Sequence, residues 1–175
     1  LIATEINGWI RHGGGQELWD ELADGFGLKN FMAGNSGVQM GGWFNKEINS
    51  ADDFKGLKMR MPGLGGQMVT KLGASVVGMP GGQIYENLVN GTIDACEWVG
   101  PWNDERSRFY EAAQYSYCPG MNEPGPLITL GCNTSGLTSL SKTTKRIKEN
   151  ATTVQNEMML TETNETNGDA IQKLI

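Results

Sequence analysis

Hydrophobic and polar positions follow two different periods in the middle of the chain. Residues 57–61 (LKMRM) alternate apolar and charged side chains, which predicts a β-strand. Residues 64–72 carry apolar side chains at helical spacing, and 75–79 predict a short buried strand. Residues 83–89 predict a second helix and 92–98 a third strand. This order of strand, helix, strand, helix and strand is typical of a parallel sheet with right-handed crossovers.

Weaker patterns predict further elements on either side of this unit. The predicted elements are a helix at 16–22, an extended glycine-rich segment at 31–44, a helix at 103–114, strands at 115–118 and 127–130, and a long helix from about 140. The last prediction depends on Ile147, Ala151, Val154 and Met158, whose 4, 3, 4 spacing indicates an amphipathic helix. The chain is therefore expected to be an α/β protein.

Composition and charge narrow the classes of function. The chain has 175 residues and a formal net charge of −6, so it has no basic excess with which to bind nucleic acid. The three cysteines show no CxxC or Cys/His spacing, which disfavours a structural zinc site. The chain begins at Leu1 and ends at Ile175, within an apparent helix, so we expect a fragment of a longer protein.

Two charged residues are candidates for ligand binding because they come at strand ends. Arg60 ends one predicted strand and Glu97 comes at the end of another, and ligands of open α/β sheets bind beyond the carboxyl ends of strands. A guanidinium there can hold a carboxylate with two parallel hydrogen bonds, whereas the alternative is an arginine on a solvated strand face. The alternative for Glu97 is a surface acid, and the alternative for Trp98 is an ordinary core side chain.

Oxygen donors at three places in the chain are candidates for a cation site. Glu123 stands in a rigid turn at 123–126, and Gln39 lies in a glycine-rich segment. With Glu97 and a backbone carbonyl, they would form an all-oxygen site suited to Na⁺ or Ca²⁺ rather than to zinc. The alternative for Glu123 is an ordinary loop residue.

Two short motifs suggest enzymes but are incomplete. Residues 12–15 (HGGG) are similar to the oxyanion loop of esterases, but the chain has no GxSxG motif, and His12 is its single histidine. Residues 63–66 (GLGG) follow a strand and begin a helix, yet position 68 is Met where GxGxxG has its third glycine. Both a catalytic triad and a dinucleotide site are therefore disfavoured.

Several consecutive motifs resemble the substrate-binding subunits of tripartite ATP-independent periplasmic (TRAP) transporters, the DctP-like family. They are NSGVQMGGWF at 35–44, DFKGLKMRMPG at 53–63, PGGQIY at 80–85, NGTIDA at 90–95, EWVGP at 97–101, PG at 119–120 and EPGP at 123–126. The resemblance is strong from about Asn7 to Leu130, and it is closest to the branch that binds 2-oxo acids and hydroxy acids together with a cation.

The resemblance implies a two-lobed periplasmic binding protein fold with hinge-crossing strands near 33–44, 92–98 and 124–130. The chain would be truncated at the N-terminus and at the C-terminus. The expected lobes are 1–34 as a remnant of the first lobe, 35–97 as second lobe, 98–123 as a return to the first lobe, and 124–175 as second-lobe strand and C-terminal helix.

The same resemblance assigns roles to particular residues. Arg60 would hold the substrate carboxylate, and Gln39, Glu97, the Trp98 carbonyl and Glu123 would hold Na⁺ or Ca²⁺. Trp98 and Tyr85 would line the pocket, and Asn35 and Gln39 would add polar contacts. No organic cofactor is expected.

The resemblance also implies a transport function in the periplasm. The protein would bind a small carboxylate such as pyruvate or lactate without catalysis and deliver it to TRAP membrane subunits. A homodimer through the C-terminal helix is a further expectation. Two alternatives stay open at this point, a hydrolase fragment and an acid-sensing module of a signalling protein.

Overall fold

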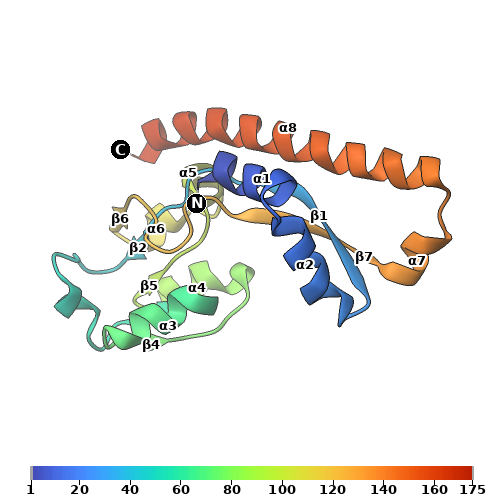
Figure 1. Cartoon of the computed structure of the whole chain (residues 1–175). Coiled ribbons are helices and arrows are strands. Elements are labelled where there is room, and N and C mark those ends of the chain that lie inside the picture. The colour runs from blue at the N-terminus through green and yellow to red at the C-terminus, as the bar shows by residue number, and fades with distance from the viewer. Residues whose placement is uncertain (1, 175) are drawn as a thin grey trace. The chain divides into compact units, whose positions relative to one another are not determined.

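Two β-sheets organise the chain in the computed structural model, which describes residues 2–174 (Figure 1). Each sheet belongs to a different compact unit. The first unit comprises Leu1–Gly37 and Gly125–Glu165, and the second comprises Val38–Pro124 and Thr166–Ile175. The mixed α/β class expected from the sequence is confirmed.

The first unit is built on one antiparallel pair of strands. β1 (Leu28–Asn35) pairs with β7 (Leu127–Asn133), and the register shifts between Met32 and Gly34. The helices of this unit are α1 (Ala3–His12), α2 (Gly15–Asp24), α7 (Thr134–Ser139) and the larger part of α8 (Lys142–Leu174). The sequence patterns predicted α2 and β7 but missed α1 and α7.

The second unit contains a mixed five-stranded sheet of order β4-β3-β5-β2-β6. Its strands are β2 (Gly42–Phe44), β3 (Lys58–Arg60), β4 (Ser75–Val76), β5 (Ala95–Cys96) and β6 (Tyr115–Tyr117). β3 is parallel to both β4 and β5, which confirms the parallel unit predicted over 57–98. The buried position expected for the strand at 75–79 is wrong, because both residues of β4 are exposed at the edge of the sheet. β2 is antiparallel to β5 and β6.

Short helices connect the strands of the second unit. They are η1 (Ala51–Phe54), α3 (Gly63–Lys71), η2 (Gly81–Gln83), α4 (Ile84–Val89), α5 (Pro101–Arg106) and α6 (Phe109–Ala112). The single helix predicted at 103–114 is wrong, because Arg108 has a left-handed backbone with φ of 58° that separates α5 from α6. α5 begins at Pro101, whose fixed φ suits the first helical position.

Two hydrophobic clusters form the core of the second unit. Phe44, Met59 and Val69 are central to one cluster, and Trp43, Ile84 and Phe109 are central to the other. Met59 and Val69 are completely buried, as the alternation in 57–61 and the apolar face of 64–72 predict. These clusters fix the ends of β3 and β5.

Helix α8 is confirmed as a long helix, but its apolar spacing does not mark its buried face. Ile147, Val154 and Met158 are 63%, 55% and 59% exposed. The buried positions are Thr152, Asn156, Leu160, Thr163, Asn167 and Ala170. Although α8 has 33 residues, no helix within residues 2–174 is both long and apolar enough to cross a membrane.

The compact units and the expected lobes divide the chain differently. Residues 98–123 are grouped with 38–97, and Gly125–Glu165 is grouped with the N-terminal residues, to which β7 is joined by its pairing with β1. Thr166–Ile175, at the end of the expected second-lobe segment, belongs to the second unit. The expected lobes refer to a complete two-lobed protein, and their boundaries stay a prediction.

Candidate functional site

The register of two parallel strands brings Arg60 and Glu97 together. Arg60, the last residue of β3, is the partner of Cys96 on β5, and the Glu97 backbone N–H donates to the Arg60 carbonyl at 3.1 Å. Arg60 Nη1 donates to Glu97 Oε1 at 2.5 Å and to the Glu97 carbonyl at 3.1 Å. Because Glu97 is 4% exposed and the Arg60 side chain 12% exposed, both the surface-acid and the solvated-arginine alternatives are wrong.

Trp98 forms a flat wall beside this ion pair. The Arg60 guanidinium lies 5.2 Å from the centre of the Trp98 ring, a cation–π distance, and Phe109 meets that ring edge-on at 6.4 Å. A Cβ atom at Gly81 would come within 2.2 Å of the indole. The absence of a side chain at Gly81 therefore lets the backbone support the ring of a partly buried tryptophan.

Gln39 joins the site from the segment that precedes β2. Its Nε2 donates to Glu97 Oε2 and to the Trp98 carbonyl, both at 3.0 Å. Its Oε1 is buried and has no hydrogen-bond partner within the described residues. Hydrogen bonds from Gly120 N–H to the Gln39 carbonyl and from Met40 N–H to the Val99 carbonyl fix this backbone.

The groups around Glu97 shift its pKa in opposite directions. Burial raises the pKa of Glu97 to about 7, although the Arg60 charge and the Gln39 hydrogen bond oppose this effect. The negative charges of Glu123 and Asp104 raise the Glu97 pKa further. Glu123 is itself exposed, but it is close enough for its charge to act on Glu97.

Asp104, which was not predicted as a site residue, is completely buried in α5. Its Oδ1 accepts from the Val99 N–H at 3.1 Å, and its Oδ2 accepts from Trp43 Nε1 at 2.8 Å. Burial raises the Asp104 pKa to about 6 against the effect of these two bonds. The signal that could have found it is an acid in the first turn of a helix that begins at Gly100-Pro101.

Two predicted pocket residues have other contacts. Tyr85 lies on α4, and its hydroxyl donates to Glu111 at 3.2 Å. Asn35 ends β1 in the first unit and is completely buried, with its Oδ1 accepting from the Gly37 N–H at 2.9 Å. Neither contact assigns the residue to ligand binding, so both roles stay predictions.

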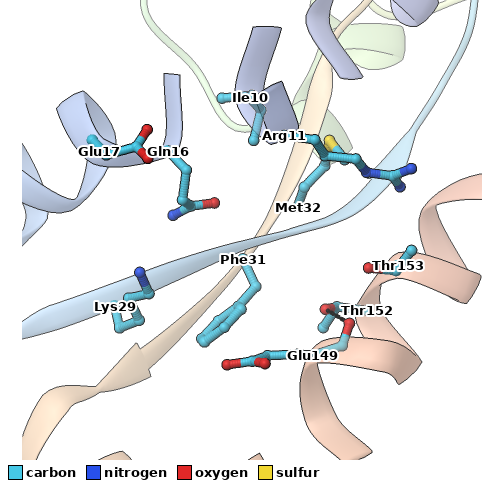
Figure 2. A pocket seen from close by; sticks show the side chains of 10 residues that line it. All are labelled: Ile10, Arg11, Gln16, Glu17, Lys29, Phe31, Met32, Glu149, Thr152 and Thr153. Atoms are coloured by element: carbon cyan, nitrogen blue, oxygen red, sulfur yellow. Dashed lines mark hydrogen bonds between the residues drawn. The ribbon is translucent and has the colours of Figure 1, made fainter. Parts of the chain in front are cut away.

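A pocket of about 340 Å³ in the first unit contains none of the predicted site residues (Figure 2). Ile10, Phe31 and Met32 supply its buried apolar side chains. Arg11 and Lys29 also line it, but each already pairs with an acid, Glu157 and Asp20 respectively. Because both basic side chains are already paired with acids, neither is free to bind an acidic ligand in this pocket.

The donor atoms near Glu97 differ in kind from the ligands of a transition-metal centre. No cluster of three or more His, Cys, Asp or Glu side chains that could hold a metal occurs within residues 2–174. The group around Gln39 instead combines one buried carboxylate, one amide and one backbone carbonyl. Such neutral and anionic oxygen donors suit a hard cation.

Proteins of known function or structure are similar to this chain over nearly its whole length. The monocarboxylate 2-oxoacid-binding periplasmic protein of Nostoc sp. PCC 7120 is 45% identical over 175 residues, which are 100% of this chain and 48% of that protein. A TRAP periplasmic solute-binding protein of Pseudoalteromonas atlantica T6c, with bound sodium and pyruvate, is 41% identical with a TM-score of 0.94 over 99% of this chain and 53% of that one.

A third similar protein is the TRAP solute-binding protein of Bordetella bronchiseptica RB50, solved as a mixed-occupancy dimer with calcium and picolinate in one site. It is 41% identical, with a TM-score of 0.96 over 99% of this chain and 52% of that one. The chain thus spans about half the length of the relatives it matches. The family model described as bacterial extracellular solute-binding protein, family 7 (DctP), matches residues 2–175. This chain therefore belongs to the DctP family, a family of transport binding proteins and not of enzymes.

Proposed function

We propose that this chain supplies the ligand-binding centre of the periplasmic solute-binding subunit of a TRAP transporter. The ligand is a small carboxylate, either a 2-oxo acid such as pyruvate or a hydroxy acid such as lactate, and it binds together with Na⁺ or Ca²⁺. The observation that carries this proposal is the convergence of Arg60, Glu97, Gln39 and the Trp98 carbonyl at one edge of the sheet.

Arg60 is suited to hold the ligand carboxylate. Within the described residues it donates hydrogen bonds from Nη1 alone, so Nε and Nη2 keep the paired donors that match a carboxylate. The Trp98 ring lies beside the guanidinium, 5.2 Å from its central carbon, and restricts its movement. A low exposure of 12% also excludes much of the water that would compete for the carboxylate.

Gln39, Glu97 and Trp98 are suited to hold the cation. The Gln39 amide nitrogen lies 3.0 Å from both Glu97 Oε2 and the Trp98 carbonyl, while the amide oxygen has no partner within the described residues. A half-turn of the amide would exchange nitrogen for oxygen and direct three oxygens toward one place. Glu123 would complete the donor set, since its charge already acts on Glu97.

The cation and the acid require each other for an electrostatic reason. An anionic ligand near Glu97 and Glu123 would be repelled unless a positive charge lay between them. A carboxylate with an adjacent keto or hydroxyl oxygen can bind one cation through both oxygens, while Arg60 neutralises the acid. The two similar structures contain sodium with pyruvate and calcium with picolinate, which supports this pairing.

The proposal extends to the complete transport protein. Two lobes that close on the ligand would be joined by strands near 33–44, 92–98 and 124–130. The boundaries of the compact units at 37/38 and 124/125 fall within two of these segments, which supports the first and third crossings. Asn35 and Tyr85 would then complete the pocket, and the closed protein would deliver its ligand to the TRAP membrane subunits.

A homodimer through α8 is also part of the proposal. Ile147, Val154 and Met158 are exposed along one stripe of the helix, and burial of such a stripe against a second copy would be favourable. The Bordetella bronchiseptica relative, solved as a dimer, supports self-association, and the exposed apolar stripe supports α8 as its interface.

Calorimetric titration of the intact protein with pyruvate, in calcium-containing and calcium-free buffer, tests the proposed function. We expect binding that requires the cation in the wild type and loss of binding in Arg60→Ala. Arg108→Ala is the matched control, because Arg108 is exposed in the same unit and pairs with Glu111. Equal binding by Arg60→Ala and the wild type, or binding indifferent to the cation, would contradict the proposal.

A further inference from the structure

Asp104 acts on the same peptide group that carries the Trp98 carbonyl. The Val99 N–H and the Trp98 C=O belong to one planar trans peptide, so they point in opposite directions. Asp104 Oδ1 accepts from that N–H at 3.1 Å, and the carbonyl accepts from Gln39 Nε2 at 3.0 Å. The hydrogen bond on one side of the peptide therefore fixes the direction of the oxygen on the other side.

A second hydrogen bond holds Asp104 in place. Its Oδ2 accepts from Trp43 Nε1 at 2.8 Å, and Trp43 lies on β2 as the strand partner of Cys96. Both Trp43 and Asp104 are buried, at 3% and 0% exposure. The carboxylate is thus anchored to the sheet beside Glu97 and does not depend on a mobile surface side chain.

The two donors explain why this position has a carboxylate. A carboxylate accepts at both oxygens, whereas an asparagine presents one acceptor and one donor and must leave either the Val99 or the Trp43 N–H without a partner. A hydrogen bond to an ionised acceptor is also stronger than a neutral one and polarises the peptide, which makes the carbonyl oxygen more negative. Burial of a carboxylate is costly, so a plain packing role would be better served by an apolar side chain.

We propose that Asp104 is a positioning residue for the cation, because it directs and polarises the Trp98 carbonyl. This inference rests on the proposed function, since the cation site is part of that function. Asp104 touches neither cation nor acid and acts through the peptide that joins Trp98 to Val99. Its loss should therefore weaken cation binding much more than acid binding measured at saturating cation.

Calorimetric titrations of the intact protein separate these two affinities. Calcium chloride is titrated at saturating pyruvate, and pyruvate is titrated at saturating calcium chloride. We expect Asp104→Asn to weaken calcium binding by about 10- to 100-fold, the usual effect of losing a group that orients a metal ligand, with little change in pyruvate affinity. Glu105→Gln, on the next residue of α5, is the control and should leave both affinities unchanged.

A double variant tests whether orientation is the cause. In Trp43→Phe with Asp104→Asn, the indole donor is gone, so the asparagine oxygen is free to accept from the Val99 N–H. We expect part of the lost calcium affinity to return relative to Asp104→Asn alone. Equal calcium affinities in the single and double variants would overturn the inference.

The outcomes also distinguish the inference from the function on which it rests. If the wild type binds calcium and pyruvate together and Asp104→Asn binds both as tightly, the positioning role is wrong and the proposed function stands. A variant that loses both affinities equally, with a lower unfolding temperature, would show a merely structural role and overturn the inference. If the wild type binds neither calcium nor pyruvate, both proposals are wrong.

Discussion

Arg60 and Glu97 form an ion pair of 2.5 Å at the carboxyl ends of two parallel strands. The pairing of Arg60 with Cys96 sets this relationship, because Glu97 is the next residue along β5. The pair occupies one nitrogen of the guanidinium and one oxygen of the carboxylate. Arg60 thus retains Nε and Nη2 as donors for a ligand, whereas the second Glu97 oxygen accepts from Gln39 Nε2. The two charged groups are coupled by their charges.

Glu97→Gln should abolish the dependence of pyruvate binding on the cation. The glutamine removes the negative charge that attracts the cation while it keeps the shape of the side chain. Titration of pyruvate into the intact protein, in calcium-containing and calcium-free buffer, measures this effect. Glu47→Gln, a change to an exposed acid in the same unit, should retain the full dependence on calcium. An undiminished calcium response in Glu97→Gln would show that Glu97 is not a cation ligand.

Gly81→Ala should disturb the wall formed by Trp98. The added methyl would come within 2.2 Å of the indole, so either the ring, which contacts the Arg60 guanidinium, or the backbone must move. We expect weaker pyruvate binding and a loss of about 1–3 kcal/mol in the free energy of unfolding, as is usual for overpacking. Gly82→Ala is the matched control, because nothing lies within 4 Å of its Cβ position. Similar pyruvate affinities for the two variants would refute this account of the wall.

The stability that the protonated Asp104 gives the folded protein should be lost as the pH rises from about 4 to about 7. Its pKa is raised from 3.8 to about 6 by burial, so the folded state holds the proton more tightly than the unfolded state. The stabilisation is complete below the unfolded pKa and disappears as the pH rises through the folded pKa. This rise in pKa corresponds to about 3 kcal/mol.

Urea unfolding of the wild type and Asp104→Asn at several pH values, with a chelator present, isolates this contribution. Other acids titrate in both proteins, including Glu97, whose raised pKa has the same sign. The wild type should lose more stability than the variant over this range. Parallel stability curves would show that Asp104 does not titrate as its burial requires.

Val154→Glu should weaken self-association through α8. Val154 is 55% exposed on the stripe that also contains Ile147 and Met158, so the change should be tolerated in the monomer but should place a charge in an apolar interface. Size-exclusion chromatography with light scattering measures the mass of the protein in solution. Gln155→Glu, a change at an exposed neighbour off this stripe, is the control. A dimer that survives Val154→Glu unchanged would place the interface elsewhere.

The local sequence predicts the part of the site that depends on strand ends. The alternation LKMRM marks β3, and the parallel unit then brings its carboxyl end to that of β5, so the proximity of Arg60 and Glu97 follows from the pattern. The periodicity also predicts α3, because the buried Val69 lies at helical spacing from its apolar neighbours.

Other features depend on contacts that no local pattern contains. The left-handed backbone of Arg108 interrupts a sequence that otherwise favours one helix. Asp104 meets Trp43, 61 residues away, and Gln39 meets Glu97 across 58 residues, so both roles appear only in the folded chain. In α8, burial selects Asn156 and Asn167 over Val154 and Met158, which reverses what hydrophobicity predicts.

A crystal structure of the intact protein with pyruvate and calcium would show whether the ion and the acid bind together beside the Arg60–Glu97 pair. We predict an anomalous peak from calcium among Gln39 Oε1, a Glu97 carboxylate oxygen and the Trp98 carbonyl, with the pyruvate carboxylate on the Arg60 guanidinium. An ion or a pyruvate molecule bound elsewhere, with the Arg60–Glu97–Gln39 group unchanged, would contradict the account.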